Sequence, residues 1–169
     1  MPGHVTLLRS YRTVTRVGIS AYVGRLRAVI GHELLLLPSV SVLPVDEAGR
    51  VLLVRHAGHG DGWAVLGGAV EVGESPAETA VREAREEIGT EVRLTRLLNV
   101  LGGQDYEVTY PNGDRAAYVT AVYEAEIISG VPTTADDELS DVAWFSPGEL
   151  GQLTLSRLSQ ALLKATGHM

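Results

Sequence analysis

Cysteine is absent from the 169-residue sequence. Disulfide bonds, thiolate catalysis and cysteine-ligated zinc are therefore excluded. Aromatic residues make up only 5% of the chain, so its core must be built mainly from valine, leucine, alanine and isoleucine. The longest apolar run, residues 34–45, contains two prolines and is too short to span a bilayer. No secretory-type apolar segment is found either, and we expect a cytoplasmic protein that does not contact a membrane.

Acidic residues are missing from the start of the chain, where Glu33 is the first. Five arginines precede it: Arg9, Arg12, Arg16, Arg25 and Arg27. Such a start is typical of an ordinary basic N-terminal segment and also of an organelle transit peptide. We interpret residues 1–17 as an N-terminal arm and residues 18–169 as one domain. The formal net charge of −7 argues against a nucleic-acid polymer as partner, because no basic stripe is available.

The spacing of apolar residues predicts a mixture of helices and strands. Residues 20–30 have helical periodicity, with Ser20 to cap the helix and Gly31 to end it. Apolar or alternating runs predict strands at residues 34–45, 51–55, 63–66, 91–101, 106–110, 115–126 and 142–145. Asn112-Gly113 predicts a hairpin turn, and residues 155–165 predict an amphipathic C-terminal helix. Strands outnumber helices, which indicates one α/β domain around a mixed sheet.

Residues 67–90 contain two glycines, a short loop and a helix with clear capping signals. Ser75 is a natural N-cap and Glu78 completes a capping box with it. Gly89 suits a left-handed C-cap. We therefore expect the helix to span residues 76–88.

This helix carries an apolar arc and an acidic arc. The apolar arc, which must face a core, consists of Ala77, Ala80, Val81, Ala84 and Ile88. Glu83, Glu86 and Glu87 fall on the neighbouring arc at i, i+3 and i, i+4 spacing. Like charges so placed repel by roughly 0.2–0.5 kcal/mol per pair. Three carboxylates in this arrangement are easier to explain if a cation lies among them.

The spacing of the charged residues resembles the signature of the Nudix hydrolase family, G-x5-E-x7-R-E-U-x-E-E-x-G-U, where U is a bulky aliphatic residue. Every fixed position matches: Gly68, Glu74, Arg82, Glu83, Glu86, Glu87 and Gly89. The two U positions hold Ala84 and Thr90, which are smaller than the family prefers. This difference affects packing more than chemistry.

The flanking segments extend the resemblance over most of the chain. Residues 51–55 look like the strand that precedes the loop in this family. Residues 63–68 resemble its W-x-L-P-G-G approach, with Leu66 where proline is usual. Trp144-Phe145, followed by residues 147–150, look like its closing strand and helix.

The resemblance implies a Nudix fold, an α/β/α sandwich around a mixed β-sheet. It also implies a pyrophosphohydrolase that depends on Mg²⁺ or Mn²⁺ and cleaves a nucleoside diphosphate linked to another moiety. Hard cations prefer oxygen ligands, and by resemblance the ligands are the Gly68 carbonyl and the carboxylates of Glu83, Glu86 and Glu87. The alternative is a non-catalytic Nudix-like domain that binds nucleotide metabolites, although the full set of glutamates argues against it.

Two residues are expected to support these ligands without binding metal. By resemblance, Arg82 is an ion-pair partner that orients a ligating glutamate; it could instead be only an i, i+4 partner of Glu78. Glu74 is predicted to fix the loop before the helix, where the helix dipole also favours a carboxylate.

The sequence patterns that point to the general base and to the substrate-binding residues are less specific than the family signature. Some members of the family take the base from the signature segment, here called the box (residues 68–90), where Glu83 or Glu86 is the candidate. Others take it from a downstream loop, where Glu138 is the candidate. Arg55 ends a strand near the expected site and is a candidate for phosphate contact. Tyr106 lies sixteen residues after Thr90 and is a candidate for substrate binding, because a tyrosine near this spacing is associated with dinucleoside polyphosphate hydrolases in the family. The alternative is a strand tyrosine in the core. The N-terminal helix and arm could cover a second copy in a homodimer.

Overall fold

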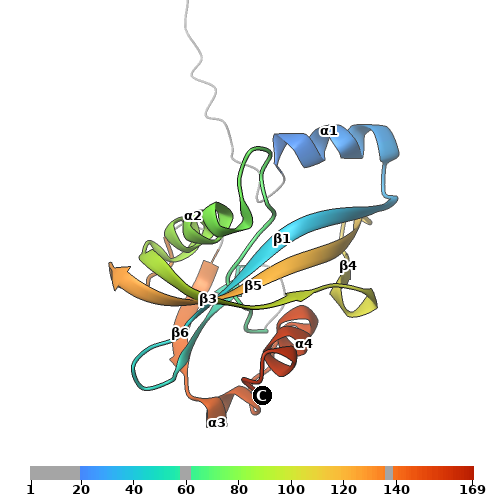
Figure 1. Cartoon of the computed structure of the whole chain (residues 1–169). Helices are drawn as coiled ribbons and strands as arrows, with labels where there is room; N and C mark the ends of the chain where they lie inside the picture. Colours follow the sequence, from blue (N-terminus) through green and yellow to red (C-terminus); the bar gives the residue numbers. More distant parts are fainter. Residues whose placement is uncertain (1–19, 58–61, 136–138) are drawn as a thin grey trace, which may run out of the picture.

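A computed structural model describes residues 20–57, 62–135 and 139–169 (Figure 1). The helices are α1 (Ala21–Ile30), α2 (Pro76–Ile88), α3 (Pro147–Leu150) and α4 (Arg157–Ala165), with a 3-10 turn η1 (Gln104–Tyr106). The strands are β1 (Leu34–Pro44), β2 (Val51–His56), β3 (Glu91–Leu101), β4 (Glu107–Thr109), β5 (Arg115–Ser129) and β6 (Leu139–Phe145).

The larger sheet is mixed, as the sequence predicts. Its strand order is β1-β5-β3, and β4 also pairs with β5. The β1–β5 pair is parallel, while β3 and β4 run antiparallel to β5. A second, two-stranded sheet consists of antiparallel β2 and β6. Residues 63–70 join the two sheets, because bridges link Ser39 with Ala69, Val42 with Leu66, and Val54 with Ala64.

Two apolar clusters hold these layers together. One lies under α2, where Ala80, Ala84 and Ile88 contact residues of β1, β2 and β3. The other lies under α4, where Leu162 and Leu163 contact residues of β1 and β2. Figure 1 shows α2 above the large sheet and α4 below it. The α/β/α sandwich around a mixed sheet is therefore confirmed. None of the described helices is long and apolar enough to cross a membrane.

The predicted bounds and caps of α2 agree with the structure. The Ser75 hydroxyl accepts a hydrogen bond from the Glu78 N–H, and the Glu78 carboxylate accepts one from the Ser75 N–H. Gly89 has the left-handed conformation (φ 67°, ψ 24°) that favours glycine. One residue of the predicted apolar arc is wrong: Ala77 is exposed and Thr79 is buried. Ala77 lies in the first turn, beside a surface groove rather than over the sheet.

Strand lengths differ from the sequence prediction where pairing decides them. Residues 63–66 form isolated bridges rather than a strand. β6 begins at Leu139, earlier than predicted, because it pairs with β2 as far as His56. β5 continues to Ser129 because β3 pairs with it from Thr120 as far as Ser129.

Candidate active site

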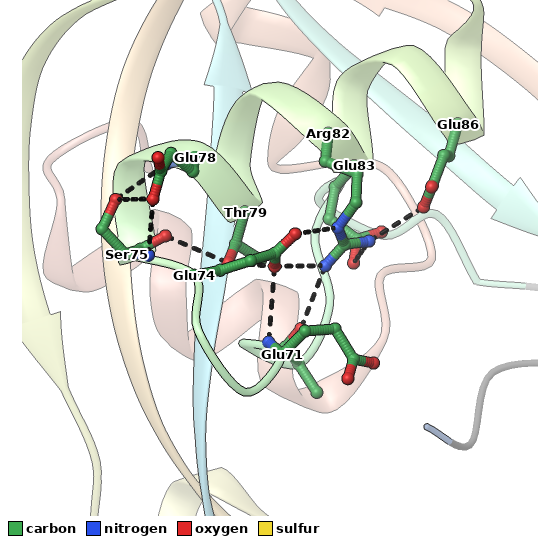
Figure 2. Close-up of polar contacts among 9 residues, drawn as sticks. Glu71, Glu74, Ser75, Glu78, Thr79, Arg82, Glu83 and Glu86 are labelled. Atoms are coloured by element: carbon green, nitrogen blue, oxygen red, sulfur yellow. Dashed lines mark hydrogen bonds and ion pairs between the residues drawn. The ribbon is translucent and has the colours of Figure 1, made fainter. Parts of the chain in front are cut away.

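Arg82 is the centre of the polar network on α2 (Figure 2). Its Nε donates to Glu74 Oε1 at 2.8 Å and its Nη2 donates to Glu74 Oε2 at 3.1 Å. Nη2 also donates to the Ala69 carbonyl at 3.3 Å. This two-pronged contact, which suits the planar guanidinium, ties the loop before α2 to the middle of the helix. Glu78 instead accepts hydrogen bonds from Ser75.

Glu74 is held from several sides in the same network. The Thr79 hydroxyl donates to Glu74 Oε2 at 2.9 Å, and the Glu71 N–H donates to the same oxygen at 3.4 Å. Hydrogen bonding from Arg82 is the main cause that lowers the pKa of Glu74 to about 2. Glu74 is therefore ionised at neutral pH and already has donors for both oxygens, which is the arrangement expected of a residue that fixes the loop.

Glu83 lies directly against the glycine pair. A Cβ atom at position 68 would come within 2.2 Å of Glu83 Oε1, so only glycine leaves room for this carboxylate. A Cβ atom at position 67 would meet the Val40 carbonyl oxygen at 2.1 Å. Burial raises the pKa of Glu83, although Arg82 Nη1 donates to it at 2.8 Å. A carboxylate so poorly solvated gains from additional positive charge.

Glu86 and Glu87 follow Glu83 about one turn later on α2. Arg82 Nη1 donates to Glu86 Oε2 at 2.8 Å, and the Glu86 side chain is largely exposed. Glu87 Oε2 accepts a hydrogen bond from the Gly67 N–H at 3.1 Å. All three box glutamates therefore contact either Arg82 or the glycine pair.

The residues present fit a hard divalent cation by their chemistry. Glu83, Glu86 and Glu87 offer carboxylate oxygens, and the Gly68 carbonyl accepts one hydrogen bond, from the Val40 N–H at 2.9 Å, which leaves its second lone pair. In the part of the chain that the structure describes, no three His, Asp or Glu side chains converge on one metal position. Glu83 and Glu86 instead share the Arg82 Nη1 donor.

The predicted substrate residue Arg55 contacts an aromatic ring rather than the α2 glutamates. Its guanidinium lies 4.5 Å from the centre of the Trp63 ring, a cation–π arrangement. Its buried Nε has no hydrogen-bond partner among the described residues. Trp63 belongs to the apolar cluster under α4, so Arg55 lies on that side of β2.

Tyr106, the second predicted substrate residue, is not brought together with α2. It is buried in η1 and lines a surface groove with Arg157, Gln160 and Lys164 of α4. Burial raises the pKa of its hydroxyl. In Figure 1, the segment between β3 and β4 lies near α4 and well apart from α2.

Glu138 lies outside the described residues and stays a prediction. The Ala135 N–H before it donates to the Glu87 carbonyl at 3.2 Å, and Leu139 after it pairs with His56. The Thr79 hydroxyl and the Gly67 N–H were missed by sequence reasoning. Only the Thr79 hydroxyl had a signal, since a threonine at the fourth helical position can reach back to a carboxylate before the cap.

Comparisons with known proteins agree with this geometry. The family model described as NUDIX domain matches residues 35–165. The NAD-capped RNA hydrolase NudC of Pseudomonas aeruginosa is 36% identical over 121 residues, which are 71% of this chain and 40% of that protein. The chain thus spans less than half the length of this relative.

Two further relatives match over most of their own length. A MutT-like protein of Streptomyces ambofaciens is 32% identical over 135 residues, 78% of this chain and 80% of that protein. The crystal structure of a MutT NUDIX hydrolase from Burkholderia pseudomallei has a TM-score of 0.61 at 27% identity. It covers 77% of this chain and 97% of that one. The chain belongs to the Nudix family, whose enzymes generally need a divalent metal ion.

Proposed function

We propose that the protein is a metal-dependent hydrolase that cleaves the diphosphate linkage of a nucleoside diphosphate joined to another moiety. The observation that carries this proposal is the position of Glu83, whose poorly solvated carboxylate lies against Gly68. Glu86 and Glu87 lie beside it on the same helix. This arrangement gathers three carboxylates near Arg82, and a bound divalent cation would supply further positive charge.

The residues of the site have two kinds of role, to bind the metal and to position the metal ligands. Glu83, Glu86, Glu87 and the Gly68 carbonyl would hold Mg²⁺ or Mn²⁺, which prefer oxygen ligands. A cation bound there supplies charge neutralisation of the diphosphate and a lowered pKa for the attacking water. Arg82 and Glu74 position these ligands, because their paired contact joins the Gly68 loop to α2. The Gly67 N–H orients the Glu87 carboxylate.

The base that takes the proton of the attacking water is Glu138 or one of the box residues Glu83 and Glu86. Replacing Glu138 with glutamine distinguishes them. A loss of turnover at unchanged metal affinity supports Glu138, whereas full turnover removes it and leaves the two residues on α2.

The substrate class is a small nucleotide derivative such as a dinucleotide, nucleotide sugar or ADP-ribose. The name of the Pseudomonas relative adds NAD-capped RNA as a substrate to test. The net charge of −7 favours the small molecules over the capped polymer. Cytoplasmic location also stays a prediction, which fractionation of the source cells tests.

The experiment is a panel of NAD, ADP-ribose, UDP-glucose and an NAD-capped oligonucleotide with Mg²⁺ or Mn²⁺, scored for monophosphate release. Wild-type protein should cleave at least one member, and Glu87→Gln should lose most of the rate. Glu107→Gln, an exposed glutamate on β4, is the matched control and should keep it. Binding of a panel member without any release by wild-type protein would contradict hydrolysis and support the metabolite-binding alternative.

A further inference from the structure

Helix α1 has an apolar face that the described domain does not cover. None of its ten residues is buried. Tyr22 and Val29 lie seven residues apart on one side of the helix, with the half-buried Leu26 between them. The Val29 side chain is 85% exposed and Tyr22 is 42% exposed. Because a helix of this length is marginal in water on its own, contacts outside the helix must hold it.

Those contacts come from Arg27. Its Nη1 donates to the Gly31 and Glu33 carbonyls at 3.1 and 2.6 Å, and its Nη2 donates to the Arg115 carbonyl at 2.6 Å. The Asp114 carboxylate lies 3.8 Å from Nε. These bonds fix α1 to the start of β5, and Val23, Leu26 and Ile30 on the same arc are half-buried. Figure 1 shows α1 standing off the sheet, near the beginning of β1.

The large sheet has an uncovered apolar area on its α2 side. This bare sheet face consists of Leu36, Leu97, Val100 and Val119, which are 67%, 52%, 56% and 42% exposed. Strand register makes it continuous. Leu36 lies opposite Ala117 and two residues before Pro38, which pairs with Val119, and Val100 pairs with Ala121. Helix α2 covers this side of the sheet only farther along, at Val40 and Val42. Exposed apolar areas of this kind mark contact surfaces.

The charge distribution favours a second copy of the chain as the occupant. Residues 1–32 contain five arginines and no acidic residue, while residues 33–169 contain the remaining nine of 14 basic residues and all 21 acidic ones. Each copy therefore joins a basic N-terminal segment to an acidic domain, and two copies are complementary to one another.

We propose that the chain forms a two-fold symmetric homodimer in which α1 of each copy packs on the bare sheet face of the other. From Tyr22 to Val29 the helix rises roughly 10 Å, and the three strands β1, β5 and β3 span roughly 10 Å at their usual spacing. Both surfaces are present in each chain, so the contact closes after two copies. This inference is independent of the proposed hydrolysis.

Light scattering on the full chain, whose monomer mass is 18.0 kDa, measures the mass in solution and so tests the dimer. Wild-type protein should have twice the monomer mass. Val29→Asp and Val119→Asp should each raise the dimer dissociation constant at least tenfold. Val131→Asp is the matched control, since Val131 is 78% exposed and lies outside both surfaces. A wild-type monomer, or a dimer that Val29→Asp does not weaken, would overturn the proposal. So would a monomer that sediments with vesicles of anionic phospholipid.

A disulfide test shows which chain α1 covers, because the sequence has no cysteine of its own. A double variant with Val29→Cys and Val119→Cys is oxidised under mild conditions. Covalent dimers on a non-reducing gel support packing between copies. A disulfide within one chain, found as an intramolecular cross-linked peptide, would show that α1 folds onto its own sheet and would overturn the proposal. Thermal melting of each variant checks that it remains folded.

Discussion

Helices α1 and α2 have the same types of capping residue but differ in how far the fold buries them. Ser20 and Ser75 both cap the first turn through the side-chain oxygen, and a glycine follows each helix. Yet α2 buries Ala80, Ala84 and Ile88 completely, while α1 buries no residue. Capping and periodicity therefore predict where a helix forms, and they do not predict what covers it.

One of the two arginines in each helix reflects this difference. Arg82 of α2 donates to the carboxylates of Glu74, Glu83 and Glu86 and organises a charged site. Arg27 of α1 donates mainly to main-chain carbonyls and anchors a helix. Arg82 therefore joins charged side chains to one another, whereas Arg27 joins a helix to the backbone of the domain. The predictions below test this distinction, beginning with the largest expected effect.

Gly68→Ala should lower kcat about 100-fold with little loss of stability. The added Cβ would displace the Glu83 carboxylate, and a ligand moved by about 1 Å can cost this much. Steady-state kinetics and thermal melting measure the two effects. Wild-type kcat in Gly68→Ala would show that the close approach of Glu83 to this glycine is not needed.

Arg82→Ala should lower the free energy of unfolding by about 2 kcal/mol, because it leaves Glu74 and the buried Glu83 without their partner. Arg27→Ala should cost less than about 1 kcal/mol, because α1 adds no buried residue to the domain. It should instead speed hydrogen exchange in α1. Urea unfolding measures the loss of stability in the two variants, and hydrogen exchange measures the opening of α1. Equal losses of stability in Arg82→Ala and Arg27→Ala would contradict the distinction between the two arginines.

Stability should fall at acid pH through Glu74. Its pKa is about 2 in the folded protein against 4.5 as the ordinary value. A lowered pKa stabilises the fold above pH 4.5, and this contribution is lost as pH falls from 4.5 to 2. Arg82, Glu83, Glu86 and Glu78 are the charged groups nearest to it in the network.

After allowance for solvent screening, the contribution of Glu74 is about 1–2 kcal/mol. Urea unfolding of metal-free protein between pH 2 and 6 should show a shallower decline for Glu74→Gln than for wild type. Glu107→Gln should follow the wild-type curve. Identical curves for wild type and Glu74→Gln would remove Arg82–Glu74 pairing as a source of stability.

Gly24→Ala should have the smallest effect and the opposite sign. A Cβ at Gly24 meets no atom within 4 Å, and alanine favours a helix interior over glycine by about 0.5–1 kcal/mol. Hydrogen exchange in α1 should slow, while the melting temperature should change little because α1 opens independently. A large rise in melting temperature would indicate that α1 is coupled to the core more closely than its exposure suggests.

Much of the candidate site followed from spacing along one helix. The positions of Glu83, Glu86 and Glu87, the caps at Ser75 and Gly89, and the helix bounds depend on local geometry, which repeats every few residues. The exposure of Ala77 did not follow, because it depends on where β3 passes under α2. Nor did the placing of Arg55 beside Trp63, which depends on contacts between β2 and residues next to α4.

The sequence by itself determined the family signature, the mixed α/β class and the acidic arc of α2, since these rest on residue type and short-range periodicity. Only the tertiary structure decided that Arg82 binds Glu74 with two nitrogens, that Glu83 lies against Gly68, and that α1 buries none of its residues. The physical reason is that hydrogen bonding and burial depend on distances between segments far apart in the chain. The pattern within one segment does not contain those distances.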